Sequence, residues 1–509
     1  MTTIAGTSPY TGELLGTATD ASTAEEVEAV VGSAMEAVAY LDRAGRSGRA
    51  ALLRAMAGGL ESNSGSLVTI SDQETGIGVE RLSGELRRAV FQLRFFADVV
   101  EEGSYLEAVI DLPADTPMGP RPDLRRMLVP LGPVAVFGAS NFPFAFSVAG
   151  GDTASALAAG SPVVAKAHSS HPETSRMSFE VMSAAAASIG APEGVLGIVY
   201  GQRAGALLVS HPDVRAVGFT GSVSGGQALM DLIAQRDRPI PFYGELSSLN
   251  PLIVSRTAAL ERGSEIGAGL AASVTMAAGQ LCTKPGVIFV PAGAEGDRLV
   301  AVFAEKLAAA PVSPLLNQRI FDSYGEILST LGAVSGVTRL VAGPDPSEGG
   351  FRVAPALYSI SAKDLRKDTA EECFGPASLV VRYTDHAELL QALELVEDSL
   401  TLTIHIGENE ADFTEQLTKV GLSKVGRMVY NGYPTGVAVS WAQTHGGPWP
   451  ATNSVHTSVG ATAIRRFLRP MTWQNAPVSA LPAELRDGSC LVPTRINGRI
   501  SMPDGYTEK

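Results

Sequence analysis

Hydrophobic residues recur every three or four positions through the first hundred residues of the chain. This is the period of an amphipathic helix, and it predicts a helix beginning near residue 24 and two more over 46–62 and 80–102. The apolar positions of the first helix are Val27, Val30, Val31, Ala34 and Val38. A polar, proline-containing passage over 111–123 interrupts this pattern, and residues 125–131 are predicted to form a strand.

Short apolar runs then alternate with helical segments. The predicted strands are 134–138, 162–166, 197–200 and 214–219, and predicted helices over 152–159 and 176–189 lie between them. Strand–helix–strand repetition at this interval predicts a parallel sheet with helices on both faces. Because such sheets bind ligands beyond the carboxyl ends of their strands, we expect functional residues there.

A second strand–helix pattern begins near residue 252. Its predicted strands are 252–254, 287–290, 378–381 and 402–406. We interpret this region as a separate catalytic domain, while the tail over 465–498 returns to strand-like sequence interrupted by prolines. The predicted fold class is therefore α/β, with at least two domains.

Composition narrows the classes of function. The chain has 509 residues, of which 45% are hydrophobic, and this length allows two or three domains with large cores. Its net charge of −14 argues against nucleic acid or an anionic membrane as a general partner. The first residues lack a secretory signal pattern and no run of 18 apolar residues occurs. Three widely spaced cysteines fit a reducing compartment, so we expect a cytoplasmic protein.

Cys282 lies in an informative sequence context. It follows a run of small residues over 271–278, predicted to be helical, and it occupies a short loop that contains Gly279 and Gly286. A thiol in such a loop is placed like a nucleophile. The alternative is a packed core residue, because free cysteine is among the most buried residue types. We interpret Cys373 as a packing residue and assign no role to Cys490.

Two polar side chains and one loop accompany this cysteine. Glu245 precedes the strand over 252–254, and burial is expected to raise its pKa toward that of a general base, unless it is a surface or helix-capping residue. Asn141 follows the strand over 134–138, where its amide suits a developing oxyanion, unless it is only a turn residue. The glycine-containing loop over 219–226 suits a phosphate, although an ordinary strand-to-helix turn has the same pattern.

Five motifs and one lysine occur in a recognisable order. They are Ser140-Asn141-Phe142-Pro143, Lys166, Phe219-Thr220-Gly221-Ser222, Glu245-Leu246, Gly279-Gln280-Leu281-Cys282 and Glu372-Cys373-Phe374-Gly375-Pro376. With them, residues 5–480 resemble the aldehyde dehydrogenase superfamily. The resemblance implies a Rossmann-variant cofactor domain, an α/β catalytic domain and a small β arm that makes a homodimer or homotetramer. The corresponding boundaries are 1–120 and 134–247, 248–462, and 121–133 and 463–500.

The resemblance also implies a role for each motif residue. Cys282 would attack the aldehyde, the Asn141 amide and the Cys282 backbone N–H would hold the oxyanion, and Glu245 would activate water. The dinucleotide contacts would be Lys166 to the adenosine ribose, Gly221, Ser222 and Gly226 at the pyrophosphate, Glu372 to the nicotinamide ribose, and Phe374 packed nearby. Candidate substrate contacts are Phe142, Leu281 and Thr283. No metal site is expected.

Departures from the common family pattern refine these expectations. Ser169 stands where many members have a glutamate that would repel a 2′-phosphate, and Arg203 could pair with that phosphate, unless it is a solvated surface residue. The resemblance therefore favours NADP, with NAD also accepted. The sequence over 433–452 departs from the usual pattern and resembles the branch of fatty aldehyde and α-ketoglutarate semialdehyde (2,5-dioxopentanoate) dehydrogenases. We expect 2,5-dioxopentanoate as the substrate.

Several alternatives remain open. The protein could act on medium- or long-chain aldehydes, or transfer the acyl group to coenzyme A, although Glu245 argues against the latter. It could be a cysteine hydrolase or acyltransferase, but this would need a histidine beside the thiol, and the sequence shows none. His168 and His171 flank the cofactor strand without other metal ligands. A non-catalytic binding protein would not need Cys282, Glu245 and Asn141 together.

Overall fold

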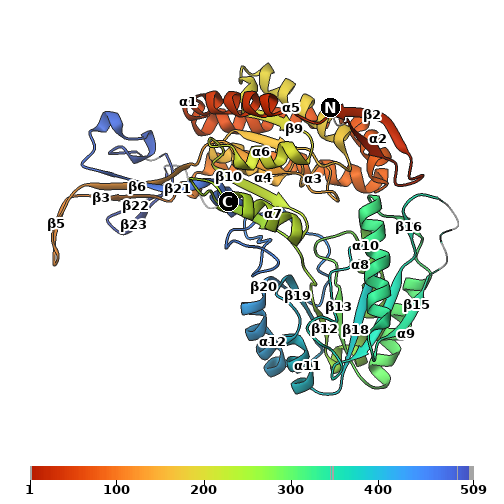
Figure 1. The fold of residues 1–509 in the computed structure, drawn as a ribbon. Helices are drawn as coiled ribbons and strands as arrows, with labels where there is room; N and C mark the ends of the chain where they lie inside the picture. The colour runs from red at the N-terminus through yellow and green to blue at the C-terminus, as the bar shows by residue number, and fades with distance from the viewer. Residues whose placement is uncertain (1–2, 344–345, 347–348, 490, 504–509) are drawn as a thin grey trace.

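The computed structural model describes residues 3–343, 346, 349–489 and 491–503, so Cys490 lies outside the described residues. Figure 1 shows three parts: a helix-rich part from the N-terminal half, an α/β part below it from the C-terminal half, and a long narrow sheet that projects to one side.

The first sheet contains five parallel strands in the order β9-β8-β7-β10-β11. Their bounds are Val134–Phe137 (β7), Val163–Lys166 (β8), Leu196–Val199 (β9), Ala216–Thr220 (β10) and Phe242–Glu245 (β11). The chain order reverses at β7, which creates a crevice at the carboxyl ends of the central strands. The sequence analysis missed β11, because four residues that include a glycine and a glutamate show no apolar run.

Alternate residues of these strands enter different cores. Val134 and Val136 of β7 pack with α1, α3, α4 and α5, whereas Ala135 and Phe137 pack with α6, α7 and the start of α1. These helices are Ala24–Ser62 (α1), Ser64–Thr75 (α2), Val79–Glu102 (α3), Gly151–Ala159 (α4), Pro172–Ser188 (α5), Gln202–Ser210 (α6) and Val223–Ala234 (α7). Gly45, with a φ of 62°, bends α1, so the first two predicted helices form one kinked element.

The second sheet contains seven strands in the order β15-β17-β18-β13-β12-β19-β20, and only β15 runs antiparallel to its neighbour. Their bounds are Leu252–Val254 (β12), Val287–Pro291 (β13), Thr338–Ala342 (β15), Ala356–Ser361 (β17), Ala377–Tyr383 (β18), Ser399–His405 (β19) and Val425–Tyr430 (β20). Helices cover both faces. They are Arg256–Thr275 (α8) and Ala294–Ala308 (α9) on one face, and Gln318–Ala333 (α10), His386–Glu394 (α11) and Ala411–Lys424 (α12) on the other.

The projecting sheet has the order β21-β6-β3-β22-β23. Its bounds are Ala108–Asp111 (β3), Leu124–Pro130 (β6), Leu468–Gln474 (β21), Thr494–Ile496 (β22) and Arg499–Ser501 (β23). The polar passage over 111–123 contains a small hairpin, Ala114–Thr116 (β4) and Gly119–Arg121 (β5), whose turn leaves Met118 95% exposed. The sheet therefore joins segments far apart in the sequence.

The remaining strands form two antiparallel pairs. They are Thr3–Thr7 (β1) paired with Leu14–Asp20 (β2), and Ser313–Pro314 (β14) paired with Arg352–Val353 (β16). Among the described residues, no helix combines the length and the apolar character needed to cross a bilayer.

Candidate active site

Glu245 ends β11 and is 2% exposed. Just beyond it, the Leu246 N–H donates to the Ala451 carbonyl at 2.9 Å, and Glu245 forms an isolated antiparallel bridge with Thr452. The end of this strand is therefore fixed against a loop about 200 residues later in the sequence. The sequence analysis placed Glu245 before β12, and the structure adds that it ends a strand of the first sheet.

The turn that carries Cys282 begins where α8 ends. The helix stops at Thr275 rather than continuing to residue 278, because Ala277 and Ala278 have φ values of 54° and 55°. A right-handed helix cannot contain residues in this left-handed region. Cys282 therefore lies in a loop beyond the helix, as the sequence analysis predicted, and the helix ends earlier than predicted.

Buried polar groups hold that loop in place. Asn250 is fully buried, and its Nδ2 donates to the carbonyls of Cys282 at 2.7 Å and Lys284 at 3.1 Å. The Nζ of Lys284 donates to the carbonyls of Cys373 at 2.9 Å and Ala377 at 2.6 Å. Because Asn250 and Lys284 donate to backbone carbonyls, they hold the half-buried Cys282 against the segment that contains Glu372.

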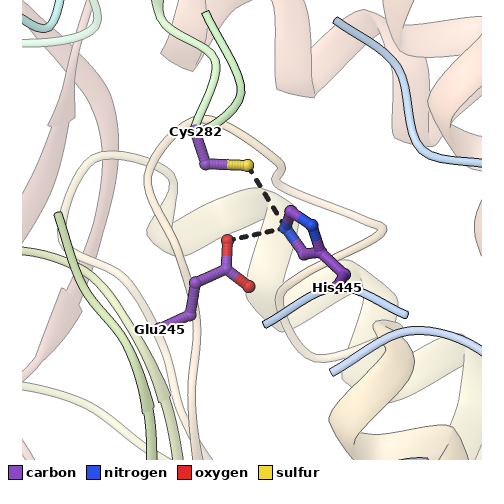
Figure 2. Close-up of side chains that lie close together, drawn as sticks. All are labelled: Glu245, Cys282 and His445. Atoms are coloured by element: carbon purple, nitrogen blue, oxygen red, sulfur yellow. Dashed lines mark hydrogen bonds and ion pairs between the residues drawn. The ribbon is translucent and has the colours of Figure 1, made fainter. Parts of the chain in front are cut away.

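His445 completes the group. Its Nε2 lies 3.5 Å from the Cys282 Sγ and 2.9 Å from the Glu245 Oε1, and Figure 2 shows the three side chains pointing toward one another. Both Glu245 and His445 are 2% exposed. The His445 N–H donates to the Thr457 Oγ1 at 2.7 Å, and the Ser458 Oγ donates to the Glu245 Oε2 at 2.9 Å. A thiol, an imidazole and a carboxylate thus meet from three separate segments.

This geometry corrects the sequence analysis, which found no histidine partner for the thiol. His445 follows Cys282 by 163 residues and lies in a stretch without helix or strand, so neither spacing nor periodicity identified it. The available signal was the unusual sequence over 433–452, in which His445-Gly446-Gly447 directly precedes a proline.

Both contacts of His445 use the same ring nitrogen. In one tautomer the Nε2–H donates to Glu245, and in the other the Nε2 lone pair faces the thiol. Transfer of the Cys282 proton to the second tautomer gives an imidazolium whose Nε2–H lies at hydrogen-bond distance from the Glu245 carboxylate. This differs from a Ser-His-Asp triad, in which the acid binds the other nitrogen.

The pKa shift of Glu245 differs from the one that the sequence analysis expected. Burial raises the pKa of Glu245, but the His445 charge and hydrogen bonds from His445, Ser458 and Cys282 outweigh burial, so the pKa is lowered rather than raised. The pKa of Cys282 is well above its ordinary value because of burial, the Glu245 carboxylate and Glu372. The thiol is therefore protonated at neutral pH, and it needs the adjacent base to become a nucleophile.

Glu245→Gln should make Cys282 react faster with iodoacetamide at pH 8. The thiolate fraction increases as pH rises through the raised pKa, and removing the Glu245 charge lowers that pKa, so the alkylation curve should move to lower pH. The pH dependence of the alkylation rate measures this shift, with the exposed Glu371→Gln as a control. Slower alkylation of the Glu245 variant would instead identify Glu245 as the base for the thiol.

Cys282, His445 and Glu245 are also the one candidate metal-binding group among the described residues, since their donor atoms lie within 4.8 Å of one another. Thiolate, imidazole and carboxylate suit zinc. The same contacts, drawn in Figure 2, also suit proton transfer between the three side chains. A bound metal ion would coordinate the sulfur and so block its attack on a substrate. We therefore interpret the cluster as catalytic.

Asn141 lies beside the cysteine loop. It follows β7, is 6% exposed, and its Nδ2 donates to the Gln280 carbonyl at 2.9 Å. Because an amide nitrogen carries two hydrogens, this bond leaves one for another acceptor. The structure thus brings Asn141 to the same loop as Cys282, as a shared oxyanion site requires.

Three candidate cofactor residues lie at or just beyond the ends of two adjacent strands of the first sheet. Lys166 ends β8, where it pairs in register with Val199 of β9, and burial lowers its pKa. Ser169 lies three residues beyond β8, and Arg203 lies in the first turn of α6, which follows β9; both are exposed. Because β8 and β9 are parallel neighbours, these side chains belong to one end of the sheet.

The start of α7 lies at the same end of the sheet. Ser222 is its N-cap and accepts from the Gly225 N–H at 3.2 Å, while the Gly221 N–H donates to the Glu245 carbonyl at 3.0 Å. At Gly226 a Cβ would lie only 2.5 Å from Leu246, so this glycine allows α7 to pack closely. The sequence analysis missed Arg319 of α10, whose Nη2 donates to the Ser222 Oγ at 3.3 Å.

Glu372 and Phe374 lie in the loop before β18 and are both half-buried. Burial raises the pKa of Glu372 to about 7, although Ser247 and Lys284 oppose this shift. Glu372 also contributes to the raised pKa of Cys282. Cys373 packs in the core of the second sheet, as the sequence indicated.

The candidate substrate residues differ in exposure. Leu281 and Thr283 are 7% and 2% exposed, whereas Phe142 is half-buried. The Phe142 ring lies 5.2 Å from the Phe146 ring, between centroids, and the Phe146 ring lies 6.4 Å from the His445 ring. The rings of Phe142 and Phe146 therefore form a row that ends at the His445 ring.

Comparison with known proteins adds independent evidence. The family model described as "Aldehyde dehydrogenase family" matches residues 1–455. "Alpha-ketoglutaric semialdehyde dehydrogenase 2" of Azospirillum brasilense is 45% identical over 455 residues, covering 88% of this chain and 86% of the relative. "Alpha-ketoglutaric semialdehyde dehydrogenase" of Acinetobacter baylyi is 40% identical over 488 residues, covering 94% of this chain and 92% of the relative.

A solved structure shows the same fold. The crystal structure of PnpE in complex with nicotinamide adenine dinucleotide has a TM-score of 0.80 with 23% identity, and the match covers 94% of this chain and 95% of that one. The resemblance and the fold class inferred from the sequence motifs are thereby confirmed.

Proposed function

Because this chain belongs to the aldehyde dehydrogenase family, we propose that it oxidises α-ketoglutaric semialdehyde (2,5-dioxopentanoate) to α-ketoglutarate. It is an aldehyde dehydrogenase, an oxidoreductase of a family that uses NAD(P). The observation that carries the proposed mechanism is the contact of the Cys282 Sγ with the His445 Nε2, which is itself bound to Glu245.

The residues of the cluster divide the chemistry between them. As the Cys282 sulfur bonds to the aldehyde carbon, its proton moves to the His445 Nε2, and Glu245 stabilises the imidazolium. The negative oxygen is held by the free N–H of the Asn141 amide and by the Cys282 backbone N–H. When bound, the nicotinamide supplies the acceptor for the hydride that must leave this carbon, so that a thioester remains on Cys282.

Hydrolysis of the thioester needs a second base step. Glu245 is ionised at neutral pH because its pKa is lowered, and it can take a proton from an attacking water molecule. The water oxygen bonds to the acyl carbon as the carbon–sulfur bond breaks, and the departing sulfur regains a proton from the His445 imidazolium. This sequence restores the thiol and the neutral histidine, and release of the captured proton from Glu245 to solvent restores its carboxylate.

The donors at the end of the first sheet fit a phosphorylated dinucleotide. Lys166, Arg203 and Arg319 supply positive charge, and the α7 N-terminus with Ser222 supplies donors suited to a pyrophosphate. Ser169 lies three residues after Lys166 in the sequence and is exposed. It carries no charge that would oppose a 2′-phosphate. We therefore propose that the enzyme prefers NADP and also accepts NAD.

Ser169→Glu should lower kcat/KM for NADP about 10-fold more than for NAD, because a carboxylate would repel the 2′-phosphate. Initial rates with each dinucleotide at saturating aldehyde measure the ratio. Ser169→Gln is the matched control, because glutamine has the size of glutamate without its charge. An unchanged ratio in the glutamate variant would remove Ser169 from the specificity argument.

The projecting sheet supports a proposed assembly as a homodimer or homotetramer. It lies away from both parallel sheets, and it exposes apolar side chains such as Ile500, which is 64% exposed. Such a surface suits contact with a second copy of the chain.

Initial rates with 2,5-dioxopentanoate, succinate semialdehyde and C6–C12 aldehydes, each with NAD and NADP, test the substrate. The proposal expects the highest kcat/KM for 2,5-dioxopentanoate. A maximum among the longer apolar aldehydes would overturn it and favour a fatty aldehyde dehydrogenase. Hydrolase activity without dinucleotide reduction would instead indicate that the Cys282–His445 pair serves acyl transfer.

A further inference from the structure

Two arginines near the catalytic cluster have buried donors with neither a hydrogen-bond nor an ion-pair partner among the described residues. These donors are the Nε and Nη2 of Arg88, on α3, and the Nε of Arg427, on β20. Among the described residues, neither arginine forms an ion pair. A buried cation with unused donors is unfavourable unless an anion or water reaches it. The arrangement therefore indicates a binding site for an acceptor that the chain itself does not provide.

Both arginines are oriented by one loop. The Nη1 of Arg88 donates to the Val437 carbonyl. The Nη1 and Nη2 of Arg427 donate to the carbonyls of Gly436 at 3.1 Å and Pro434 at 2.5 Å. Elements more than 300 residues apart thus bring two guanidinium groups to the loop over 434–437, which precedes the segment that carries His445.

Aromatic contacts connect this loop to the catalytic group. The Arg88 Cζ lies 5.8 Å from the centre of the Phe146 ring, and that ring neighbours His445. Burial lowers the pKa values of Arg88 and Arg427, and a negative charge on Cys282 would oppose that shift in both. Glu245 has the same effect on Arg88.

A third arginine nearby has an ion-pair partner, although its Nη1 makes no hydrogen bond to any described residue. Arg81 lies two turns before Arg88 on α3, and its Nη1 is 3.7 Å from the Glu85 Oε2. Glu85 also accepts the N–H groups of Phe144 and Ala145 through its Oε1, at 2.8 and 3.0 Å. Arg81 thus has an ion-pair partner, whereas Arg88 and Arg427 have none among the described residues.

We propose that Arg88 and Arg427 bind the carboxylate of the substrate while Cys282 attacks its aldehyde. The inference rests on the proposed function, because that substrate is an aldehyde with a carboxylate at its other end. Four carbon–carbon bonds separate the two groups, which keeps them within about 6 Å of each other. Guanidinium N–H groups match a carboxylate in geometry as well as charge, so the pair selects a charged semialdehyde over an apolar aldehyde of equal length.

The test compares 2,5-dioxopentanoate with pentanal, which has the same number of carbons and no carboxylate. Arg88→Gln and Arg427→Gln should each lower the ratio of kcat/KM for 2,5-dioxopentanoate to that for pentanal by about 10- to 200-fold, since each removes a charge-assisted contact. Arg88→Lys, which retains charge without the forked donors, should lose less. Arg87→Gln, an exposed neighbour on the same helix, should leave the ratio unchanged.

The outcomes separate this inference from the proposed function. A wild-type enzyme without preference for 2,5-dioxopentanoate overturns both. A wild-type preference that both glutamine variants retain overturns only the arginine site. Inhibition by glutarate, against the uncharged glutaramide, provides a readout that does not depend on turnover: its inhibition constant should rise at least 10-fold in each variant. Thermal unfolding curves of the variants check that the fold is intact.

Discussion

Cys282→Ala is expected to lower kcat for aldehyde oxidation by about 10⁴-fold or more, because no thioester can form without the sulfur. No other described cysteine can replace it: Cys373 is 8% exposed in the core of the second sheet. The fold and the dinucleotide site should persist, since the substitution removes one half-buried atom from a loop held by Asn250 and Lys284. Steady-state rates and dinucleotide titration measure the two properties separately.

Cys373→Ala is the matched control for this experiment. It removes the same atom from a packed site, so it should cost about 1 kcal/mol of unfolding free energy and leave the rate within about threefold of wild type. Appreciable turnover by Cys282→Ala would refute the nucleophile assignment. Loss of dinucleotide binding in that variant would show that the cysteine loop also shapes the cofactor site.

His445→Gln is expected to lower the rate of the first turnover by about 10²- to 10⁴-fold. Glutamine can still donate to Glu245, but it cannot take and return the thiol proton. Glu245→Gln should affect a different step: the first turnover should persist, while steady-state turnover falls because thioester hydrolysis loses its base. Rapid-mixing measurements of dinucleotide absorbance separate the initial burst from the steady state.

His456→Gln is the control for the histidine substitution. His456 lies in the same loop and is half-buried, with its ring 5.8 Å from the Tyr243 ring rather than beside the thiol. Its replacement should leave the burst unchanged. An undiminished burst in His445→Gln, together with a lost burst in Glu245→Gln, would assign thiol deprotonation to Glu245 and leave His445 a positioning role.

The local sequence was sufficient to predict most strands of the two large sheets. Largely buried strands such as β7, β8 and β13 consist almost entirely of apolar residues, which made them recognisable without their neighbours. Strand β11 was missed because Phe242-Tyr243-Gly244-Glu245 is stabilised by pairing with β10, and that information is not local. The end of α8 was also misplaced, since a small-residue run does not reveal two alanines in the left-handed region.

The sequence by itself determined the family, the nucleophile candidate and the position of Glu245 within a motif, because short motifs keep their residues together along the chain. Only the tertiary structure placed His445 against Cys282 and Glu245, and Arg88 and Arg427 at one loop. It also reversed the expected pKa shift of Glu245. Burial alone would raise that pKa, but contacts with His445 and Ser458, about 200 positions away in the sequence, lower it, and these contacts form only in the folded chain.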